Sequence, residues 1–337
     1  MLQRPFSQRK AAIGGPVGLR LQRTQNCKSS FIPRFSRRRV AFSERRRFES
    51  SAGTVSQIAA LVRFEPSDLR MKRYGSNSGN GGGARIRCDG SLIEPLLARR
   101  PVSGQRVSAA DGLRWLEHVA ETDRRAAPIC VPVHPEFADA AGELGMELTE
   151  ADLEAKAIYL WLSPERDVLH RYVSPALRRD VERCQGDGRS LVLLRMSFRL
   201  AGGGSHANAL VVDAVRRTVT RFDPAVDPRH YDAMHGSIDL FMEALVAEAF
   251  PGYRYVSPIE TSPRAGPQVV ERPAHGDGDI GYCTVYSLLF HHLVALHPDL
   301  DPTCIVTAMS DGGAEAVRDR VLRYLAAVNE WLARQTD

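Results

Sequence analysis

The chain has 337 residues, of which 43% are hydrophobic and 25% charged, proportions that are typical of a soluble protein. No apolar run approaches the roughly 18 residues that a transmembrane helix needs, so the sequence predicts no membrane partner. The six cysteines include no Cys-x-x-Cys pair, which argues against a structural zinc site and against a disulfide scaffold. We therefore expect a reducing compartment and an intracellular protein that is not secreted. The cysteines are Cys27, Cys88, Cys130, Cys184, Cys283 and Cys304.

The net charge of +5 conceals an asymmetry along the chain. Residues 1–50 hold thirteen Lys or Arg against two Glu and contribute +11, which leaves −6 for residues 51–337. Arginine runs at 37–39 and 45–47 could bind nucleic acid or another polyanion. The same composition also suits an organellar transit segment, or a solvated tail without a dedicated role.

Residues 1–107 show no sustained helical or strand period and include a glycine-rich patch at residues 76–83. This region is predicted to be a disordered tail rich in Arg, Ser and Gly. From residue 108 onward the pattern becomes that of a folded domain, which we expect to cover residues 108–337. The sequence indicates no oligomeric state.

The expected elements of this domain begin with helices and then change to strands. Helices are predicted at 108–119, 148–162, 168–182, 231–249, 283–296 and 317–332. Strands are predicted at 190–200, 206–213, 218–223 and 253–259. A short connection joins residues 206–213 to 218–223, so these two strands are expected to form an antiparallel pair. The mixture predicts an α+β fold.

Cys283 is expected at the N-terminus of a helix. Gly281 and a glycine-rich stretch precede it, apolar residues then recur at three- and four-residue steps, and Pro298 ends the pattern. Unpaired N–H groups and the helix dipole favour an anion at such a position, so they lower a thiol pKa and make a nucleophile. In isolation, a cysteine here is more often a small core residue.

A catalytic cysteine needs a base to take its proton and a group to orient that base. His206 begins one predicted strand, and Asp223 ends the next, 17 residues later. Pairing of the two strands would bring the carboxylate of Asp223 within reach of the imidazole of His206. Alone, the histidine is an ordinary surface or core residue and Asp223-Pro224 an ordinary turn, but with Cys283 the order His, Asp, Cys indicates a catalytic triad.

Gln268, in Gly266-Pro267-Gln268, is a candidate for the oxyanion hole. Its amide could donate to a tetrahedral intermediate alongside the backbone N–H of Cys283. It could equally be a surface glutamine of a loop. His291, His292 and Cys304 do not predict a metal site, because adjacent helix residues point in different directions.

These motifs resemble the adenain-like cysteine proteases, which include the proteases specific for SUMO and other ubiquitin-like proteins. The resemblance rests on His206-Ala207-Asn208-Ala209-Leu210, on Arg221-Phe222-Asp223-Pro224, and on the run that begins at Gly281-Tyr282-Cys283. The His-Ala-Asn-Ala-Leu phrase and His297-Pro298-Asp299 are most similar to versions in large DNA viruses. The resemblance covers roughly residues 187–300 and implies a papain-like core, with a central antiparallel sheet against the cysteine helix.

The resemblance implies a cysteine peptidase that cleaves an amide or isopeptide bond in ubiquitin-like conjugates or in viral or host proteins. It implies no metal or organic cofactor, and the host cytoplasm, the nucleus or a virion as its place. Gln268 lies 15 residues before Cys283 instead of a few, and Ala207 stands where SUMO proteases often have tryptophan. Both departures argue against SUMO itself as the substrate.

Two other functional classes fit the same residues. An acyltransferase could use the triad with an acyl-CoA donor, although the third residue of such enzymes is commonly Glu. The chain could also be an inactive nucleic-acid-binding or virion structural protein that acts through its basic tail.

Overall fold

The computed structural model describes residues 87–101, 107–123, 126–134, 137, 156–163, 168–199, 205–231, 233–262, 264–274 and 282–335. All of them belong to one compact unit. Of residues 1–107, which are predicted to be disordered, residues 1–86 and 102–106 lie outside the described residues, and so does the predicted polyanion contact through residues 1–50.

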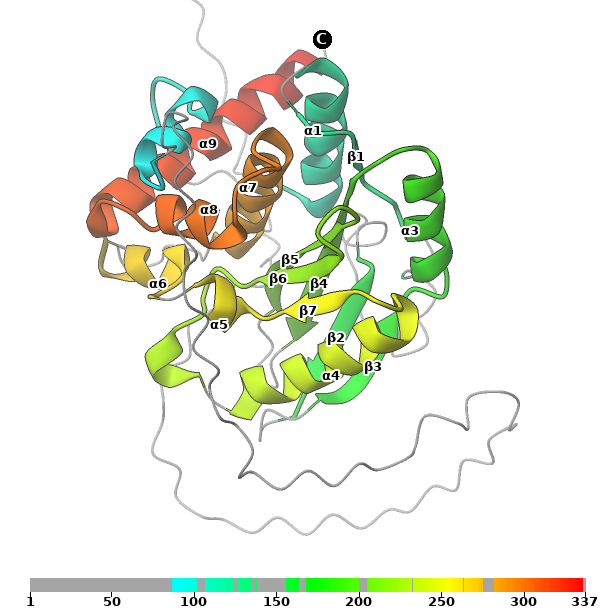
Figure 1. Ribbon diagram of the computed structural model, residues 1–337. Helices are drawn as coiled ribbons and strands as arrows, with labels where there is room; N and C mark the ends of the chain where they lie inside the picture. The colour runs from blue at the N-terminus through cyan, green and yellow to red at the C-terminus, as the bar shows by residue number, and fades with distance from the viewer. Residues whose placement is uncertain are drawn as a thin grey trace, which may run out of the picture. The chain divides into compact units, whose positions relative to one another are not determined.

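A mixed sheet forms the centre of this unit, in the order β3-β2-β4-β5-β6-β7 (Figure 1). The pairs β2–β3, β4–β5 and β5–β6 are antiparallel, whereas β2–β4 and β6–β7 are parallel, and the short β1 pairs in parallel with β4. The strands are β1 (Ile129–Cys130), β2 (Ile158–Leu162), β3 (Val168–Val173), β4 (Leu191–Arg199), β5 (Ser205–Asp213), β6 (Thr218–Phe222) and β7 (Arg254–Val256).

Helices cover both faces of the sheet (Figure 1). On one face α1, α7, α8 and α9 pack against alternate strand residues such as Leu193, Val211 and Phe222. On the other face α3 and α4 pack against the intervening residues, such as Val192, Leu194 and Leu210. The helices are α1 (Ala109–Thr122), α3 (Leu177–Gly186), α4 (Ala233–Ala249), α5 (Pro258–Thr261), α6 (Pro267–Glu271), α7 (Cys283–Leu296), α8 (Pro302–Met309) and α9 (Gly313–Gln335).

The predicted pair of strands at 206–213 and 218–223 is confirmed, because β5 and β6 pair antiparallel with Val211 opposite Thr220. The predicted helix at 148–162 is wrong at residues 158–162, which form β2. This run, Ile-Tyr-Leu-Trp-Leu, is apolar at every position and is almost wholly buried between β3 and β4. Such a run has no period that separates a buried strand from a buried helix. The predicted helix at 168–182 is likewise β3 followed by α3.

Residues 87–101 pack onto the domain, although the sequence analysis assigns them to the tail. The side chain of Ile93 is fully buried in the core that α7 and α9 share. The backbone N–H of Gly90 donates to Asp311 Oδ2 at 3.1 Å, and that of Ala98 donates to the carbonyl oxygen of Arg323 at 3.2 Å. The folded part therefore begins before residue 108.

Two disulfides join four of the described cysteines, which corrects the argument against a disulfide scaffold. Cys88 pairs with Cys304, and Cys130 pairs with Cys184, over 216 and 54 residues of sequence. Disulfide bonding depends on the distance between Cα atoms in the fold, so the spacing of cysteines along the sequence did not reveal it. The cysteine pattern therefore no longer favours a reducing compartment. Among the described residues, Cys283 is the one cysteine that no disulfide includes.

No helix in the described ranges is both long enough and apolar enough to span a membrane. The helix α7 is nevertheless buried on nearly all sides, because it lies between the sheet and the helices α1, α8 and α9. This burial fixes the position of its first residue, Cys283, relative to the strands.

Burial of His291 on α7 is expected to make stability depend on pH. Burial, with a smaller contribution from Arg195, lowers the pKa of His291 from 6.5 to about 3, although its Nε2 donates to the carbonyl oxygen of Leu210 at 3.1 Å. The unfolded chain binds this proton near pH 6.5 and the folded chain only near pH 3. The free energy of unfolding is therefore at its full value above pH 6.5, where both states leave His291 neutral. It decreases as the pH falls from 6.5 toward 3, by up to about 1.4 kcal/mol per pH unit.

We expect His291→Gln, which keeps a donor for Leu210, to flatten this part of the pH dependence. Urea unfolding of the wild type and the variant between pH 7 and about pH 4 measures it. The exposed His230 is the matched control, and His230→Gln should leave the slope unchanged. An equally steep slope in His291→Gln would contradict the prediction.

Candidate active site

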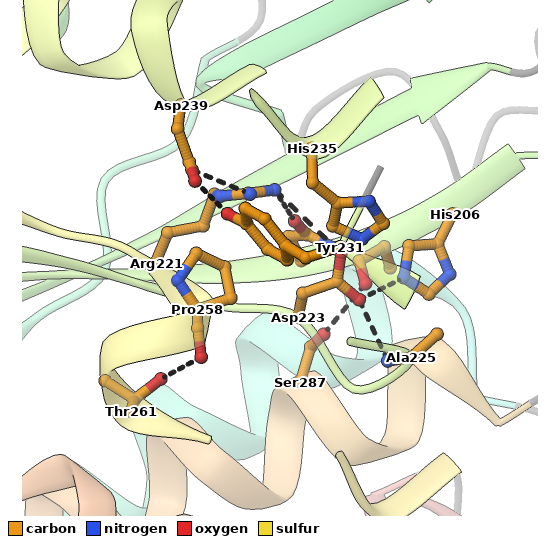
Figure 2. Close-up of polar contacts among 12 residues, drawn as sticks. His206, Arg221, Asp223, Ala225, Tyr231, His235, Asp239, Pro258, Thr261 and Ser287 are labelled. Carbon is orange, nitrogen blue, oxygen red and sulfur yellow. Dashed lines mark hydrogen bonds and ion pairs between the residues drawn. The ribbon is translucent and has the colours of Figure 1, made fainter. Parts of the chain in front are cut away.

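His206 and Asp223 meet at one end of the sheet, as the hairpin predicts. His206 is the second residue of β5, and Asp223 directly follows β6, opposite Asn208 in the register of the two strands. The imidazole Nε2 of His206 lies 2.7 Å from Asp223 Oδ1 (Figure 2). The side chain of Asp223 is 1% exposed and that of His206 13%, so the carboxylate is buried and the imidazole partly reaches solvent. The ring of Phe198, on β4, packs against that imidazole at 5.0 Å between centroids.

The Asp223 carboxylate is held in its ionised form. Burial alone would raise its pKa, but His206, His235 and Arg221 more than offset this and hold the pKa of the carboxyl well below its ordinary value. The backbone N–H of Ala225 also donates to Oδ1, at 2.9 Å. An ionised carboxylate can only accept a hydrogen bond, so Nε2 of His206 is the donor. Nδ1 of the same ring is left for another partner.

The helix α7 begins at the same end of the sheet. Along α7, Ser287 Oγ donates to the carbonyl oxygen of Ala207 at 3.3 Å, and His291 contacts Leu210. Residue numbers therefore rise together in α7 and β5, and the two elements start at the same end. Cys283 is the first residue of α7, one turn before Ser287 and on the same side of the helix. It is 4% exposed.

Gln268 lies beside the turn that follows Asp223, in spite of its distance in sequence from the helix of Cys283. The backbone N–H of Gln268 donates to the carbonyl oxygen of Pro224 at 2.9 Å, and that of Gly266 donates to Val226 at 2.8 Å. A Cβ at position 266 would lie 2.5 Å from the Pro224 oxygen, closer than real Cβ contacts. Glycine at 266 is therefore required for this approach.

A second contact joins the helix of Gln268 to the helix of Cys283. The hydroxyl of Tyr286 donates to Glu271 Oε2 at 2.7 Å, in the buried layer between α6 and α7. Glu271 is three residues after Gln268, and Tyr286 is three residues after Cys283, so each lies one turn further along its own helix. Arg318, on α9, lies 3.7 Å from Glu271 Oε1. This contact spans the 15-residue separation, whose glycine-rich part, residues 275–281, lies outside the described residues.

The residues that sequence reasoning missed lie next to Asp223, on the side of the carboxylate that does not contact His206. Arg221 is fully buried and bonded to Asn208 and Tyr255. It is also bonded to Asp239 (Figure 2). An arginine near the end of a predicted strand was the available signal, because a charge that the sheet buries needs a partner. The partners on α4 and β7 could not be read from it.

His291, His292 and Cys304 do not converge. His291 contacts Leu210, His292 contacts the hydroxyl of Tyr324, and Cys304 is in a disulfide.

No protein-family model matches the sequence, and a search of curated proteins finds no significant match. A search of solved structures finds SUMO protease Ulp1 with its catalytic cysteine oxidised to a sulfenic acid, at 12% identity and a TM-score of 0.33, covering 71% of this chain and 83% of that one. It also finds the Chlamydia trachomatis effector Cdu1 bound to ubiquitin, at 13% identity and a TM-score of 0.33, covering 68% and 92%.

The Ulp1 protease domain in complex with Smt3, the yeast ortholog of SUMO, matches at 11% identity and a TM-score of 0.30, covering 73% of this chain and 95% of that one. With such TM-scores these likenesses are distant, and the function proposed below rests on the geometry of this chain. The likeness to versions in large DNA viruses stays a prediction.

Removing the Tyr286 hydroxyl should weaken the junction of α6 and α7. Tyr286→Phe leaves the buried Glu271 without its hydrogen bond, which we expect to lower the free energy of unfolding by about 1–3 kcal/mol. Urea unfolding measures the change. Tyr253→Phe, which removes a partly buried hydroxyl bonded to Gln185 at 2.9 Å, is the control and should change less. Equal stability of Tyr286→Phe and wild type would show that this bond does not hold α6.

Proposed function

We propose that this protein is a cysteine peptidase in which Cys283 is the nucleophile, His206 the base and Asp223 the group that orients the base. Gln268 is proposed to bind the oxyanion. The observation that carries the proposal is the partly buried 2.7 Å bond between His206 and Asp223, at the end of the sheet where the helix of Cys283 begins.

The position of the thiol suits this role. As the first residue of α7, Cys283 lies next to N–H groups that have no partner within the helix, and these groups and the helix dipole stabilise a thiolate. The other cysteines in the described ranges are in disulfides, so none of them competes as a nucleophile.

The approach of the two catalytic groups has one geometric requirement. His206 lies two residues before Asn208 and four before Leu210, so it shares the face of β5 that packs toward α4. The helix α7 packs on the opposite face. Thiol and imidazole can therefore meet only beyond the end of the sheet, where both β5 and α7 start. Residues 200–204, which precede β5 in the sequence, and residues 275–281, which precede Tyr282 and α7, lie outside the described residues.

The reaction proposed follows from these positions. Nδ1 of His206 takes the proton of Cys283, and Asp223 stabilises the imidazolium through Nε2. The thiolate attacks the carbonyl carbon, and the oxyanion is bound by the backbone N–H of Cys283 and the amide of Gln268. The C–N bond breaks, the amine leaves with the proton from His206, and water releases the acyl group from the thioester.

The substrate proposed is a peptide or isopeptide bond in a ubiquitin-like conjugate, because the His206, Asp223 and Cys283 motifs resemble proteases of that class. Ubiquitin, to which Cdu1 is bound, is the first candidate to test. SUMO, the substrate named for Ulp1, comes after it, because Gln268 and Ala207 depart from the pattern of SUMO proteases. A viral or host protein is the other candidate substrate.

Cys283→Ala should abolish covalent labelling by ubiquitin or SUMO that carries a C-terminal vinyl sulfone. His206→Asn and Asp223→Asn should slow labelling by roughly two to four orders of magnitude, because the thiolate loses its partner. Labelling is measured by mass spectrometry of the intact protein.

An exposed histidine and a half-buried aspartate that contact each other serve as matched controls for this experiment. His230→Asn and Asp227→Asn alter a surface pair and should leave labelling unchanged. Equal labelling of Cys283→Ala and wild type would remove the proposal. Transfer of labelled acetyl groups from acetyl-CoA, without peptide cleavage, would instead assign an acyltransferase.

Gln268→Ala should lower kcat by about 10²–10³-fold with a small change in KM, because an oxyanion donor acts mainly in the transition state. Steady-state hydrolysis of the best fluorogenic substrate measures both constants. Gln185→Ala, far from His206 in sequence and bonded to Tyr253, is the control. An unchanged kcat in Gln268→Ala would show that another group binds the oxyanion.

A further inference from the structure

Arg221 is a charged side chain with no exposed surface, fixed in one position by three hydrogen bonds. Its Nε donates to the Tyr255 hydroxyl oxygen at 2.9 Å, its Nη1 to Asn208 Oδ1 at 2.8 Å, and its Nη2 to Asp239 Oδ1 at 2.9 Å. These partners come from β7, β5 and α4. The guanidinium therefore cannot swing, and its position is set by three separate elements.

The carboxylate of Asp239 is the counterion of this arginine. It also accepts hydrogen bonds from the hydroxyls of Tyr255, at 2.6 Å to Oδ1, and of Tyr231, to Oδ2. Both oxygens of Asp239 are therefore bonded. Asp239 needs nothing from the His206–Asp223 pair.

The positive charge of Arg221 also faces Asp223. Nη1 of Arg221 lies 3.9 Å from Asp223 Oδ2, which accepts no hydrogen bond from the described residues. His235, on α4, faces the same oxygen at 3.7 Å (Figure 2). Oδ1 thus carries the hydrogen bonds to His206 and Ala225, whereas Oδ2 faces fixed or titratable positive charge. Two buried carboxylates, those of Asp223 and Asp239, share the one positive charge of Arg221. The net charge of these three groups is therefore −1, which favours a second positive charge next to them.

We propose that Arg221 is a positioning residue, which keeps Asp223 ionised and correctly oriented so that His206 can become an imidazolium when Cys283 loses its proton. This inference rests on the proposed function. Arg221 is wholly buried and therefore out of reach of a substrate, and of the proposed catalytic groups its charge faces Asp223, through which it acts. Asn208, Asp239 and Tyr255 hold it at the distance at which it can attract Oδ2 without displacing His206 from Oδ1.

A purely structural role predicts a loss of stability and nothing else. The positioning role predicts a change in the pH dependence of the thiol. Without the arginine, the buried Asp223 takes up a proton at higher pH, the imidazolium loses its support, and the thiolate forms only at higher pH. The two roles therefore differ in the pH at which the thiolate of Cys283 forms, which does not depend on how stable the fold is.

The test is peptide-resolved alkylation of Cys283 by iodoacetamide in the full chain, followed between about pH 4 and 9. The double variant Arg221→Met, Asp239→Asn removes one charge of each sign, which replaces a buried ion pair without leaving a lone charge. Arg221→Lys keeps the charge and is the conservative rescue. Arg320→Met is the control, a buried arginine on α9 whose Nη1 donates to the carbonyl oxygen of Ala308 at 3.3 Å. Thermal unfolding of each variant records stability separately.

In the double variant we expect the rise of the Cys283 alkylation rate with pH to begin at a higher pH than in wild type. At about pH 6 its rate should be at least 10-fold below that of wild type. Arg221→Lys should restore most of that rate. Arg320→Met should keep the wild-type pH dependence of the alkylation rate, whatever its stability. A folded double variant whose alkylation rate depends on pH as in wild type would overturn the positioning role and leave the peptidase proposal intact. A folded Arg221→Met with the same pH dependence as folded Arg221→Lys and wild type would overturn it in the same way. Wild-type Cys283 that titrates as an ordinary thiol would overturn both.

Discussion

The arrangement at the end of the sheet depends on keeping a charged carboxylate out of water. Asp223 is 1% exposed, and burial by itself would favour its neutral acid. Two imidazoles and one guanidinium reverse that preference, and the bond to His206 is the shortest of these contacts at 2.7 Å. A neutral acid at this place would have a hydroxyl to donate and would no longer require a donor from the ring. The protonation state of Asp223 therefore decides which nitrogen of His206 carries hydrogen.

Packing around α7 supplies the rigidity that this electrostatic arrangement needs. Ser287 and His291 bind backbone oxygens of β5, and Tyr286 binds Glu271 of α6 on another side of the helix. The contacts of α7 thus fix the position of Cys283 along the helix axis, relative to β5, which carries His206, and to α6, which carries Gln268. A displacement of α7 along its axis would disturb all three contacts together.

Local patterns predicted the parts of the site that lie within single elements or adjacent ones. The spacing of apolar residues after Cys283 predicted α7, and the short link between two strands predicted the contact of His206 with Asp223. The strand β2 was mistaken for a helix because every residue from Ile158 to Leu162 is apolar. The partners of Arg221 are 13, 18 and 34 residues away on three elements, and no local pattern joins them. The disulfides were missed for the same reason, since they join residues that only the fold brings together.

The bond between Cys88 and Cys304 closes a covalent ring of chain that contains every strand of the sheet. A ring of 216 residues restricts the unfolded chain, an effect worth about 5 kcal/mol in chain-entropy models. It also means that a protease cutting once in any loop between these two residues opens the ring without separating two fragments. Such a nicked molecule would gain only the one water molecule that hydrolysis adds and would divide into two fragments only after reduction, so electrophoresis without a reductant would not reveal the cut.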